Sequence, residues 1–240
     1  MEPRHVRKLR DQKANVPGTA NAWIKTLRQL FAWAQEAHSL KTNPAKDVPY
    51  IRLTGEGFHR WTAEEVRQFE SKFPVGTMAR LAFDLLLFTG VRRSDVVRLG
   101  PPMEVNSGTA LKFVVTEGQR RLKKELELPI LPKLRRSIDA TETGKGTYLV
   151  TKFGQSFAVA GFGNWFRDRC NEAGLPNCSA HGLRKAGATI AAENGATAHQ
   201  LKAIFGWESI ADAEHYTKRA SQVKLAKSAM HLLERDQAED

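Results

Sequence analysis

The sequence predicts an α+β protein that is mainly helical and carries one small antiparallel β-sheet. Apolar residues recur at helical spacing before residue 90 and again from about residue 158. Between them, segments 111–116 and 124–130 are typical of strands, and the second alternates strictly between polar and apolar residues. A chain of 240 residues, 41% hydrophobic and 26% charged, is long enough for one or two domains with a sizeable core.

The first predicted helix lies in the N-terminal segment. Thr19 is placed to cap it, and an apolar face recurs at helical spacing through Trp23, Leu27, Leu30, Phe31 and Ala34. After a short connection, Asn43 and Pro44 stop the pattern. Residues 44–60 contain two prolines and two glycines without a clear period. We interpret this stretch as an interdomain linker.

The elements that follow have clear boundary signals. Thr62 and Glu65 form a capping box that starts a helix. A further helix is expected over about 76–89, and Gly90 is a natural residue to end it. Glu117 and Gly118 mark the turn region between the two strands, and a weak third strand is expected at 148–150. The remainder is expected to be helical, interrupted by glycines.

Several protein classes are excluded by composition and motifs. The longest apolar run, 81–88, contains Asp84 and is too short to span a bilayer. No signal peptide is found, and Cys170 and Cys178 are too few for a disulfide framework, so a reducing cytoplasmic setting is expected. The sequence has no P-loop, dinucleotide-binding glycine loop, nucleophile elbow or Cys/His set with zinc spacing.

The charge balance points toward polyanions. Thirty-seven Lys and Arg residues oppose 26 Asp and Glu residues, giving a net charge of +11. Such a surface attracts nucleic acid. Composition alone leaves open the alternative of a merely basic protein.

Four short segments carry residues suited to phosphate chemistry. They are, in chain order, TGVRRSD at 89–95, the basic turn RRLKK at 120–124, HGLRK at 181–185, and GWES at 206–209 followed by HYT at 215–217. Together these segments resemble the tyrosine recombinase (phage integrase) family, in which an Arg box, a hairpin Lys, an H-x-x-R box, a G-H/W motif and a Tyr follow in this order. The resemblance covers roughly 60–235. Residues 17–46 are similar to the last helices of the family's core-binding domain.

The resemblance implies a site-specific DNA recombinase or integrase that cleaves and rejoins strands through a 3′-phosphotyrosine intermediate, with neither metal nor ATP. Two guanidiniums clamp a phosphodiester better than lysines can, because they bind it in bidentate fashion. By resemblance the catalytic residues are Arg92, Lys123, His181, Arg184, Trp207 and Tyr216, with Asp95 in support and Arg93, Arg121, Lys124 and Lys185 binding DNA. Tyr216 would be the nucleophile and His181 would transfer its proton. His199 and His215 receive no role.

Two positions in this reading depart from the family. Trp207 stands where many members have His, and an indole cannot shuttle protons. Counting back about eight residues from Pro129, where the family usually has its hairpin Lys, reaches Arg121, whose pKa makes it a poor proton donor. A small change in the turn would let Lys123 or Lys124 serve instead, and we prefer Lys123. If none serves, the chain is a catalytically impaired DNA-binding remnant.

The predicted domain organisation is a partial core-binding segment with its linker, residues 1–53, followed by a catalytic domain, residues 54–240. The core-binding domain of the resembled family has four or five helices, whereas only about two are expected here, which implies truncation either in cloning or in the gene. The two remaining helices are expected to expose apolar surface around Trp23, Phe31 and Trp33.

The expected partners are double-stranded DNA and other protomers bound to the same DNA. The protomers are expected to exchange an apolar helix at 221–235. No membrane partner is expected. The expected setting is the bacterial or phage-like cytoplasm, associated with the nucleoid. A purely helical protein-interaction module is the remaining alternative, and the residues around Tyr216 argue against it.

Overall fold

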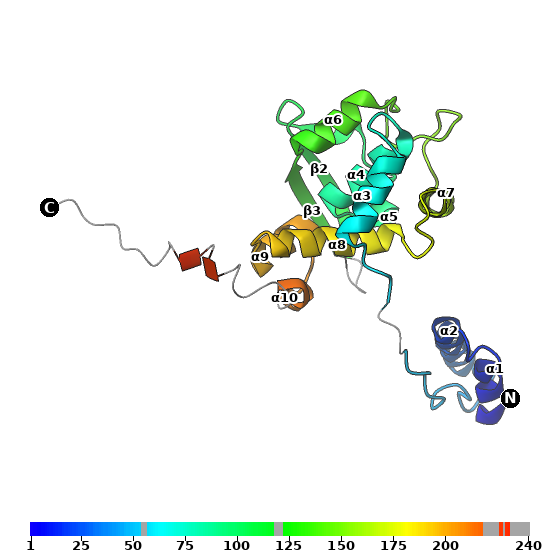
Figure 1. Cartoon of the computed structure of the whole chain (residues 1–240). Helices are drawn as coiled ribbons and strands as arrows, with labels where there is room; N and C mark the ends of the chain where they lie inside the picture. The colour runs from blue at the N-terminus through cyan, green and yellow to red at the C-terminus, as the bar shows by residue number, and fades with distance from the viewer. Residues whose placement is uncertain (54–56, 118–121, 218–225, 228, 231–240) are drawn as a thin grey trace. The chain divides into compact units, whose positions relative to one another are not determined.

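The computed structural model describes residues 1–53, 57–117, 122–217, 226–227 and 229–230. The chain divides into two compact units, Met1–Gly57 and Phe58–Asp240, drawn in Figure 1. Among the described helices, none is long and apolar enough to cross a membrane.

The first unit consists of two helices and the loop that follows them, α1 (Pro3–Asp11) and α2 (Pro17–Glu36). Its small core joins Val6, Ile24, Ala45 and Val48. Arg28 donates hydrogen bonds to the carbonyls of Ala45 and Val48, at 3.1 and 2.7 Å. The loop after α2 is therefore packed into this unit, and the expectation that the linker begins at residue 44 was wrong.

The predicted helix of this unit is confirmed, but its limits and its buried face differ. It begins at Pro17 rather than after Thr19. Ala20 and Ile24 form its buried face, whereas Trp23, Leu30 and Trp33 are exposed. The preceding helix α1 was missed because it is strongly charged and buries only Val6, so it has no apolar period.

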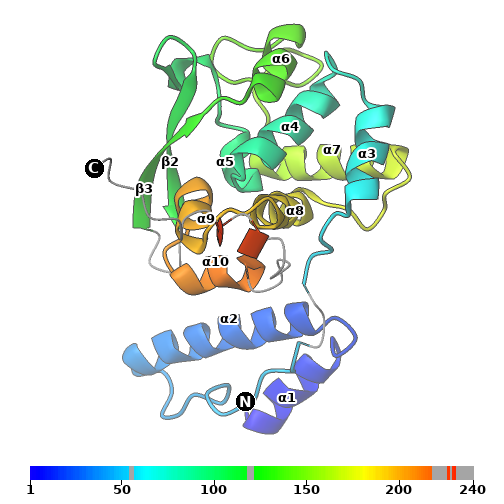
Figure 2. The ribbon, with the colours of Figure 1, turned by 60° about the vertical axis from the view of Figure 1, so that its left-hand side comes forward.

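The second unit is mainly helical with one antiparallel sheet. Its elements are α3 (Ala63–Lys72), α4 (Met78–Thr89), α5 (Arg93–Val96), η1 (Pro101–Met103), β1 (Glu104–Val105), β2 (Ala110–Glu117), β3 (Leu122–Pro129), α6 (Pro132–Ala140), α7 (Val159–Glu172), α8 (Ala180–Glu193), α9 (Ala198–Phe205) and α10 (Ile210–Thr217). The sheet order is β1-β2-β3. Both predicted strands are confirmed within two residues. Figure 2 shows α9 and α10 near β3 and α8.

The third strand of the sheet is not the predicted one. β1 at Glu104–Val105 pairs with β2, whereas Val150 makes only an isolated bridge with Ser156. Segment 148–150 is apolar because it is buried in a loop. Tyr148 is fully buried, and its backbone N–H donates a hydrogen bond to the carbonyl of Leu99 at 2.8 Å. A short apolar run does not distinguish a strand from a buried loop.

Helix α4 forms the centre of this unit and contacts α6, α7 and α8. Its apolar residues are buried nearly all round, as expected for a helix enclosed by others. Thr77 caps its N-terminus by accepting a hydrogen bond from the N–H of Arg80, and Gly90 ends it as predicted. The predicted capping box of α3 is also confirmed, with both Thr62 and Glu65 making their bonds.

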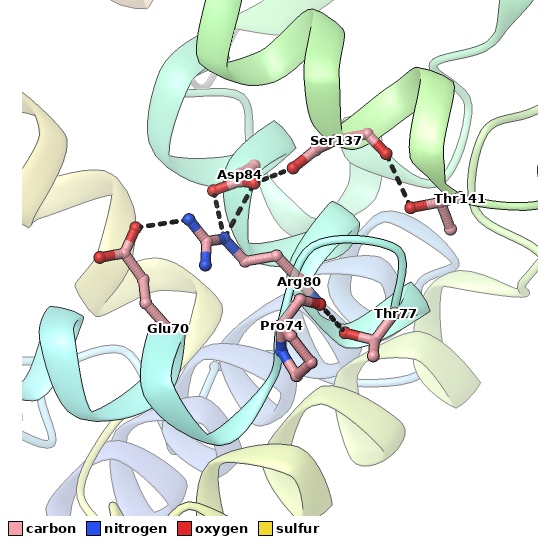
Figure 3. A network of polar contacts seen from close by, with 7 residues as sticks. All are labelled: Glu70, Pro74, Thr77, Arg80, Asp84, Ser137 and Thr141. Carbon is pink, nitrogen blue, oxygen red and sulfur yellow. Dashed lines mark hydrogen bonds and ion pairs between the residues drawn. The ribbon is translucent and has the colours of Figure 1, made fainter.

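A buried polar network ties α3, α4 and α6 together (Figure 3). Arg80 pairs with Glu70 at 2.8 Å and with Asp84 at 3.0 Å. Ser137 on α6 donates a hydrogen bond to Asp84, whose side chain is only 1% exposed. Burial raises the pKa of Asp84, against the opposing effects of Ser137 and Arg80. Arg80 and Asp84 thus form a buried ion pair in which each side chain has a further polar partner, Glu70 for Arg80 and Ser137 for Asp84. Buried charges need such pairing and hydrogen bonding to offset their loss of hydration.

Candidate functional site

The connection from α4 to α5 places the first predicted arginine. Gly90 adopts a left-handed conformation with φ of 61°. A Cβ there would lie 2.4 Å from Cε1 of Phe205, so glycine is required both by the turn and by the close approach of α9. Two residues later, half-buried Arg92 is the N-cap residue of α5. The turn that ends α4 therefore fixes the starting point of the Arg92 side chain.

Arg184 lies on the second turn of α8, whose N-terminus is capped by Ser179. The side chain is buried and donates hydrogen bonds to the carbonyls of Gly90 and, at 2.8 Å, of Phe205. Its guanidinium also lies over the rings of Phe205 and Trp207, 5.3 and 5.8 Å from their centroids. These contacts link the end of α4 to the end of α9 through one cation.

Three aromatic rings are stacked beside this cation. Phe205 stacks on Trp207 with centroids 4.9 Å apart and planes 15° apart. Trp207 stacks on Tyr216 at 5.3 Å and 5°. Trp207 is buried, and it packs in a small apolar cluster of α8, α9 and α10. The tyrosine is thereby oriented by tertiary packing as well as by its own helix α10.

A cavity of about 440 Å³ brings the predicted residues together. It is lined by Arg92, His181, Arg184, Lys185, Trp207, Ala211, Asp212, His215 and Tyr216. The lining therefore contains both predicted clamp arginines, the predicted nucleophile and the predicted proton carrier. A concave site with convergent cations and titratable groups is suited to a phosphate.

The titratable groups of the cavity are shifted in defined directions. The pKa of His181 lies below its ordinary 6.5, through desolvation first and then through the positive charges of Lys185, Arg184 and Arg92. The pKa of Tyr216 is raised by burial, and the carboxylate of Asp212 adds to this, whereas Arg184 and Arg60 act in the opposite direction. At neutral pH the cavity therefore holds a neutral imidazole and a protonated phenol.

The remaining predicted residues near the first arginine lie beside this cavity. Arg93 lines a neighbouring cavity of about 330 Å³, which shares Arg92 and His181 with the first. Asp95 is buried on α5 and forms an ion pair with Arg98. A supporting role of Asp95 toward Arg92 stays a prediction.

The hairpin lysines differ in the face they present. In β3, Lys124 pairs with Val115, and Lys123 pairs with Thr116. The side chain of Val115 packs against Gly206, the residue that precedes Trp207. Its Cγ2 lies 3.4 Å from the position that a Cβ on Gly206 would occupy. Because paired residues share a face, Lys124 is on the side of Gly206, and Lys123 is on the opposite side. Neither lysine is among the described residues lining the cavity, and Arg121 lies outside the described part of the chain.

Sequence reasoning missed two polar residues of the cavity, Asp212 and His215. His215 is exposed, as assumed for a surface residue, yet its ring makes an edge contact with Tyr216 at 5.4 Å between centroids. Asp212 precedes Tyr216 by one helical turn. Helical i, i+4 spacing from the tyrosine could have identified Asp212, whereas the lining role of His215 depends on how α10 packs.

The chemistry available here is that of charge stabilisation next to a nucleophile. Two guanidiniums and a lysine can neutralise a phosphate, and the phenol and imidazole can form a nucleophile and its proton acceptor. A phosphodiester seated between the cations would have Tyr216 at its edge. The cavity therefore places groups suited to phosphate binding beside groups suited to nucleophilic catalysis.

Comparisons with known proteins identify the family and the fold. The profile of the phage integrase family matches residues 60–222. Among solved structures, a lambda integrase(75-356) dimer bound to a COC′ core site is similar, with a TM-score of 0.73, 17% identity, and coverage of 100% of this chain and 83% of that chain. The Tn1549 transposon integrase in complex with transposon right end DNA has a TM-score of 0.66 at 14% identity, covering 97% and 85%. No curated protein sequence matches the chain.

Proposed function

Because this chain belongs to the phage integrase family of tyrosine recombinases, we propose that it is a site-specific recombinase that cleaves and rejoins DNA strands through Tyr216. The observation that carries the proposal is the single cavity in which Tyr216 meets Arg92 and Arg184. The solved structures of lambda and Tn1549 integrases hold DNA, which supports the same class of substrate here.

In the proposed reaction, the Tyr216 oxygen attacks the phosphorus of a DNA phosphodiester. The bond to the 5′-oxygen breaks, a 3′-phosphotyrosine forms, and the phenol proton is taken up as the oxygen attacks. Rejoining reverses these steps with a 5′-hydroxyl as the attacking group. The energy of the broken bond is kept in the protein–DNA link, so strand exchange requires no nucleotide hydrolysis.

The two arginines would bind the non-bridging oxygens of the reacting phosphate. Negative charge grows on these oxygens in the transition state, and preorganised donors are most effective when their positions are already fixed. Arg184 is held by the carbonyls of Gly90 and Phe205. The position of the Arg184 side chain is therefore fixed before DNA binds. The side chain loses its conformational entropy during folding rather than on DNA binding.

His181 is the proposed proton acceptor for Tyr216. The raised pKa of Tyr216 keeps the phenol protonated at neutral pH, so attack requires a base. The lowered pKa of His181 keeps its imidazole neutral and able to accept that proton. Trp207 stands where a second imidazole would be, and its stacked ring would orient the phenol instead.

The proton for the leaving 5′-oxygen would come from the β2–β3 hairpin. We revise the preference from Lys123 to Lys124, because Lys124 shares the face of β3 that is directed toward Gly206. Lys185 lines the cavity and is suited to a further phosphate contact, and Arg93 to the neighbouring one. The net charge of +11 would support binding along the duplex.

Assembly on DNA would bring several protomers together. One of the similar solved structures is a lambda integrase tetramer bound to a Holliday junction. We keep the proposal that the apolar segment 221–235 docks on a neighbouring catalytic domain, although most of it lies outside the described residues. Deletion of 221–240 would then abolish multimers on DNA and leave single-site binding intact.

The decisive test uses a nicked suicide substrate, from which the cleaved strand cannot be rejoined. The wild-type chain is expected to yield a covalent protein–DNA adduct that survives denaturing electrophoresis. Tyr216→Phe removes only the attacking oxygen and is expected to bind DNA normally without forming the adduct. An adduct from the Phe variant would overturn the assignment of Tyr216.

The second candidate function, a DNA-binding remnant without activity, is favoured by the position of Arg121 where the family has its hairpin Lys. The same assay separates it from the first. DNA binding by the wild-type chain with no adduct on any suicide substrate would support the remnant.

A further inference from the structure

Three residues of different chemistry meet outside the cavity that holds Tyr216. His59, Glu65 and Cys178 offer an imidazole nitrogen, a carboxylate oxygen and a thiol sulfur, all within 4.8 Å of one another. They come from three separate segments: the stretch 58–61 before α3, the first turn of α3, and the residue before the Ser179 cap of α8. We propose that these three residues form a binding site for a single zinc ion.

The donor set selects the kind of cation. Magnesium and calcium prefer all-oxygen ligands, whereas a thiolate combined with an imidazole suits zinc. Zinc bonds of about 2.0–2.3 Å place neighbouring ligand atoms about 3.5 Å apart in a tetrahedron. Ligand atoms up to 4.8 Å apart must therefore close by up to about 1.3 Å, and the His59–Glu65 pair at 2.8 Å must open by about 0.7 Å. Three protein ligands leave the fourth position for water or an external ligand.

The ligands are already brought together by hydrogen bonds. His59 Nε2 lies 2.8 Å from each carboxylate oxygen of Glu65. Glu65 Oε2 also accepts the N–H of Thr62 at 2.7 Å, which orients the carboxylate and leaves that bond in place as an outer-shell contact. The Cys178 sulfur lies within 4.8 Å of the same carboxylate. On zinc binding, the thiol proton is released to solvent and a sulfur–metal bond replaces the S–H bond.

The backbone around His59 is anchored to α8. The indole of Trp61 donates to the carbonyl of Ser179 at 2.9 Å, and Lys185 donates to the carbonyl of Phe58 at 3.0 Å. A Cβ at Gly182 would lie 1.9 Å from the carbonyl oxygen of His59, so only glycine permits this approach. His59 is thus held beside the start of α8, and its side chain, 40% exposed, provides the entry path.

A bound zinc ion would fasten the stretch 58–61 to α3 and to the start of α8. Phe58 in this stretch packs against the ring of His181, with centroids 4.6 Å apart. The metal would therefore hold that contact in place. The zinc proposal does not rest on the proposed recombination, and its test needs no DNA.

The experiment uses the full chain without a polyhistidine tag, stripped with EDTA and kept reduced. We expect uptake of one equivalent of Zn²⁺, a higher melting temperature with Zn²⁺ than with Mg²⁺, and a thiolate charge-transfer absorption with Co²⁺ as a spectroscopic substitute. Cys178→Ser should remove the absorption and lower zinc affinity by at least about 100-fold, because outer-shell changes alone cost 10–100-fold.

Matched controls keep the outcome clear. Cys170→Ser changes the other buried cysteine, and His199→Ala changes an exposed histidine outside the cluster. Both should bind zinc as the wild type does. His59→Ala alters an exposed ligand and tests the site should Cys178→Ser fail to fold. No zinc uptake by the wild-type chain, or equal uptake by His59→Ala, would overturn the proposal.

Discussion

Tyr216 stacks on Trp207 with ring centroids 5.3 Å apart and planes 5° apart. Trp207 continues the stack to Phe205, beside the guanidinium of Arg184. The proposed nucleophile and the proposed phosphate clamp thus share one aromatic support. In this chain a tryptophan stands at the position where many family members have histidine, and the flat face of its indole suits it to this support.

Substitutions at Trp207 should distinguish the contribution of its stacked ring face to cleavage from the contribution of its indole N–H. Trp207→Phe keeps an aromatic face, and we expect single-turnover cleavage within about tenfold of wild type, whereas Trp207→Ala should lose about 100-fold or more because the phenol is misplaced. Cleavage of a suicide substrate measures both. Equal losses for the two variants would show that the N–H, not the stacked face, matters.

The electrostatic surroundings of His181 predict its titration in the DNA-free chain. We expect a midpoint below 6.5, and Lys185→Ala should raise it by removing a nearby positive charge. NMR titration of the imidazole protons measures this. A His181 midpoint at or above 6.5 would contradict the prediction.

The same shift has a consequence for stability. Between the lowered folded pKa and 6.5, the unfolded chain binds more protons at His181 than the folded chain does. The free energy of unfolding should therefore rise with pH through this window. Urea titrations at several pH values would detect the slope, and His181→Gln should reduce it.

The strand register predicts which lysine donates the leaving-group proton. Lys124→Ala should slow cleavage by about 10²–10⁴-fold, the usual contribution of general acid catalysis. A substrate with a 5′-bridging sulfur should restore the rate, because a thiolate leaves without a proton. Lys123→Ala is the matched control from the opposite face of β3, with little effect expected on either substrate. If the substrate with the 5′-bridging sulfur restored the cleavage rate of Lys123→Ala and not that of Lys124→Ala, Lys123 would be the proton donor.

Gly90 should be intolerant of a side chain. Gly90→Ala forces a left-handed alanine, at about 1–2 kcal/mol, and sets its Cβ against Phe205. We expect a lower free energy of unfolding by at least this amount, measured by denaturant titration. Gly161→Ala in α7 is the control, because nothing lies within 4 Å of its new Cβ, and helical alanine is favoured by roughly 0.5–1 kcal/mol. Equal stability of the two variants would refute the close approach of α9 to Gly90.

The buried charge network should be sensitive to the loss of one partner. Asp84→Ala leaves Arg80 without its buried counter-charge, and we expect a loss of about 3–5 kcal/mol in the free energy of unfolding. Glu64→Ala breaks an exposed ion pair with Arg67 and should leave stability nearly unchanged. Denaturant titration of both variants compares them directly. A small effect at Asp84 would mean that the network is replaceable by packing alone.

Local signals predicted much of the fold correctly. The capping box at Thr62, the end of α4 at Gly90 and the two long strands follow from contacts within a few residues, which the sequence displays directly. The errors arose where tertiary contacts override local pattern. Tyr148 is buried without forming a sheet strand, and Trp23 is exposed although it shares the spacing of apolar residues.

By itself, the sequence determined the mainly helical class, the two long strands and the motifs that carry Arg92, His181, Arg184 and Tyr216, because caps, periodicity and short motifs act along the chain. Only the tertiary structure decided that Arg184 binds the carbonyls of Gly90 and Phe205, that Tyr216 stacks on Trp207, and that Lys124 rather than Lys123 faces Gly206. It also brought His59 and Glu65 to Cys178. The physical reason is that these contacts join residues distant in sequence, and their distances are set by how the helices and the sheet pack rather than by spacing along the chain.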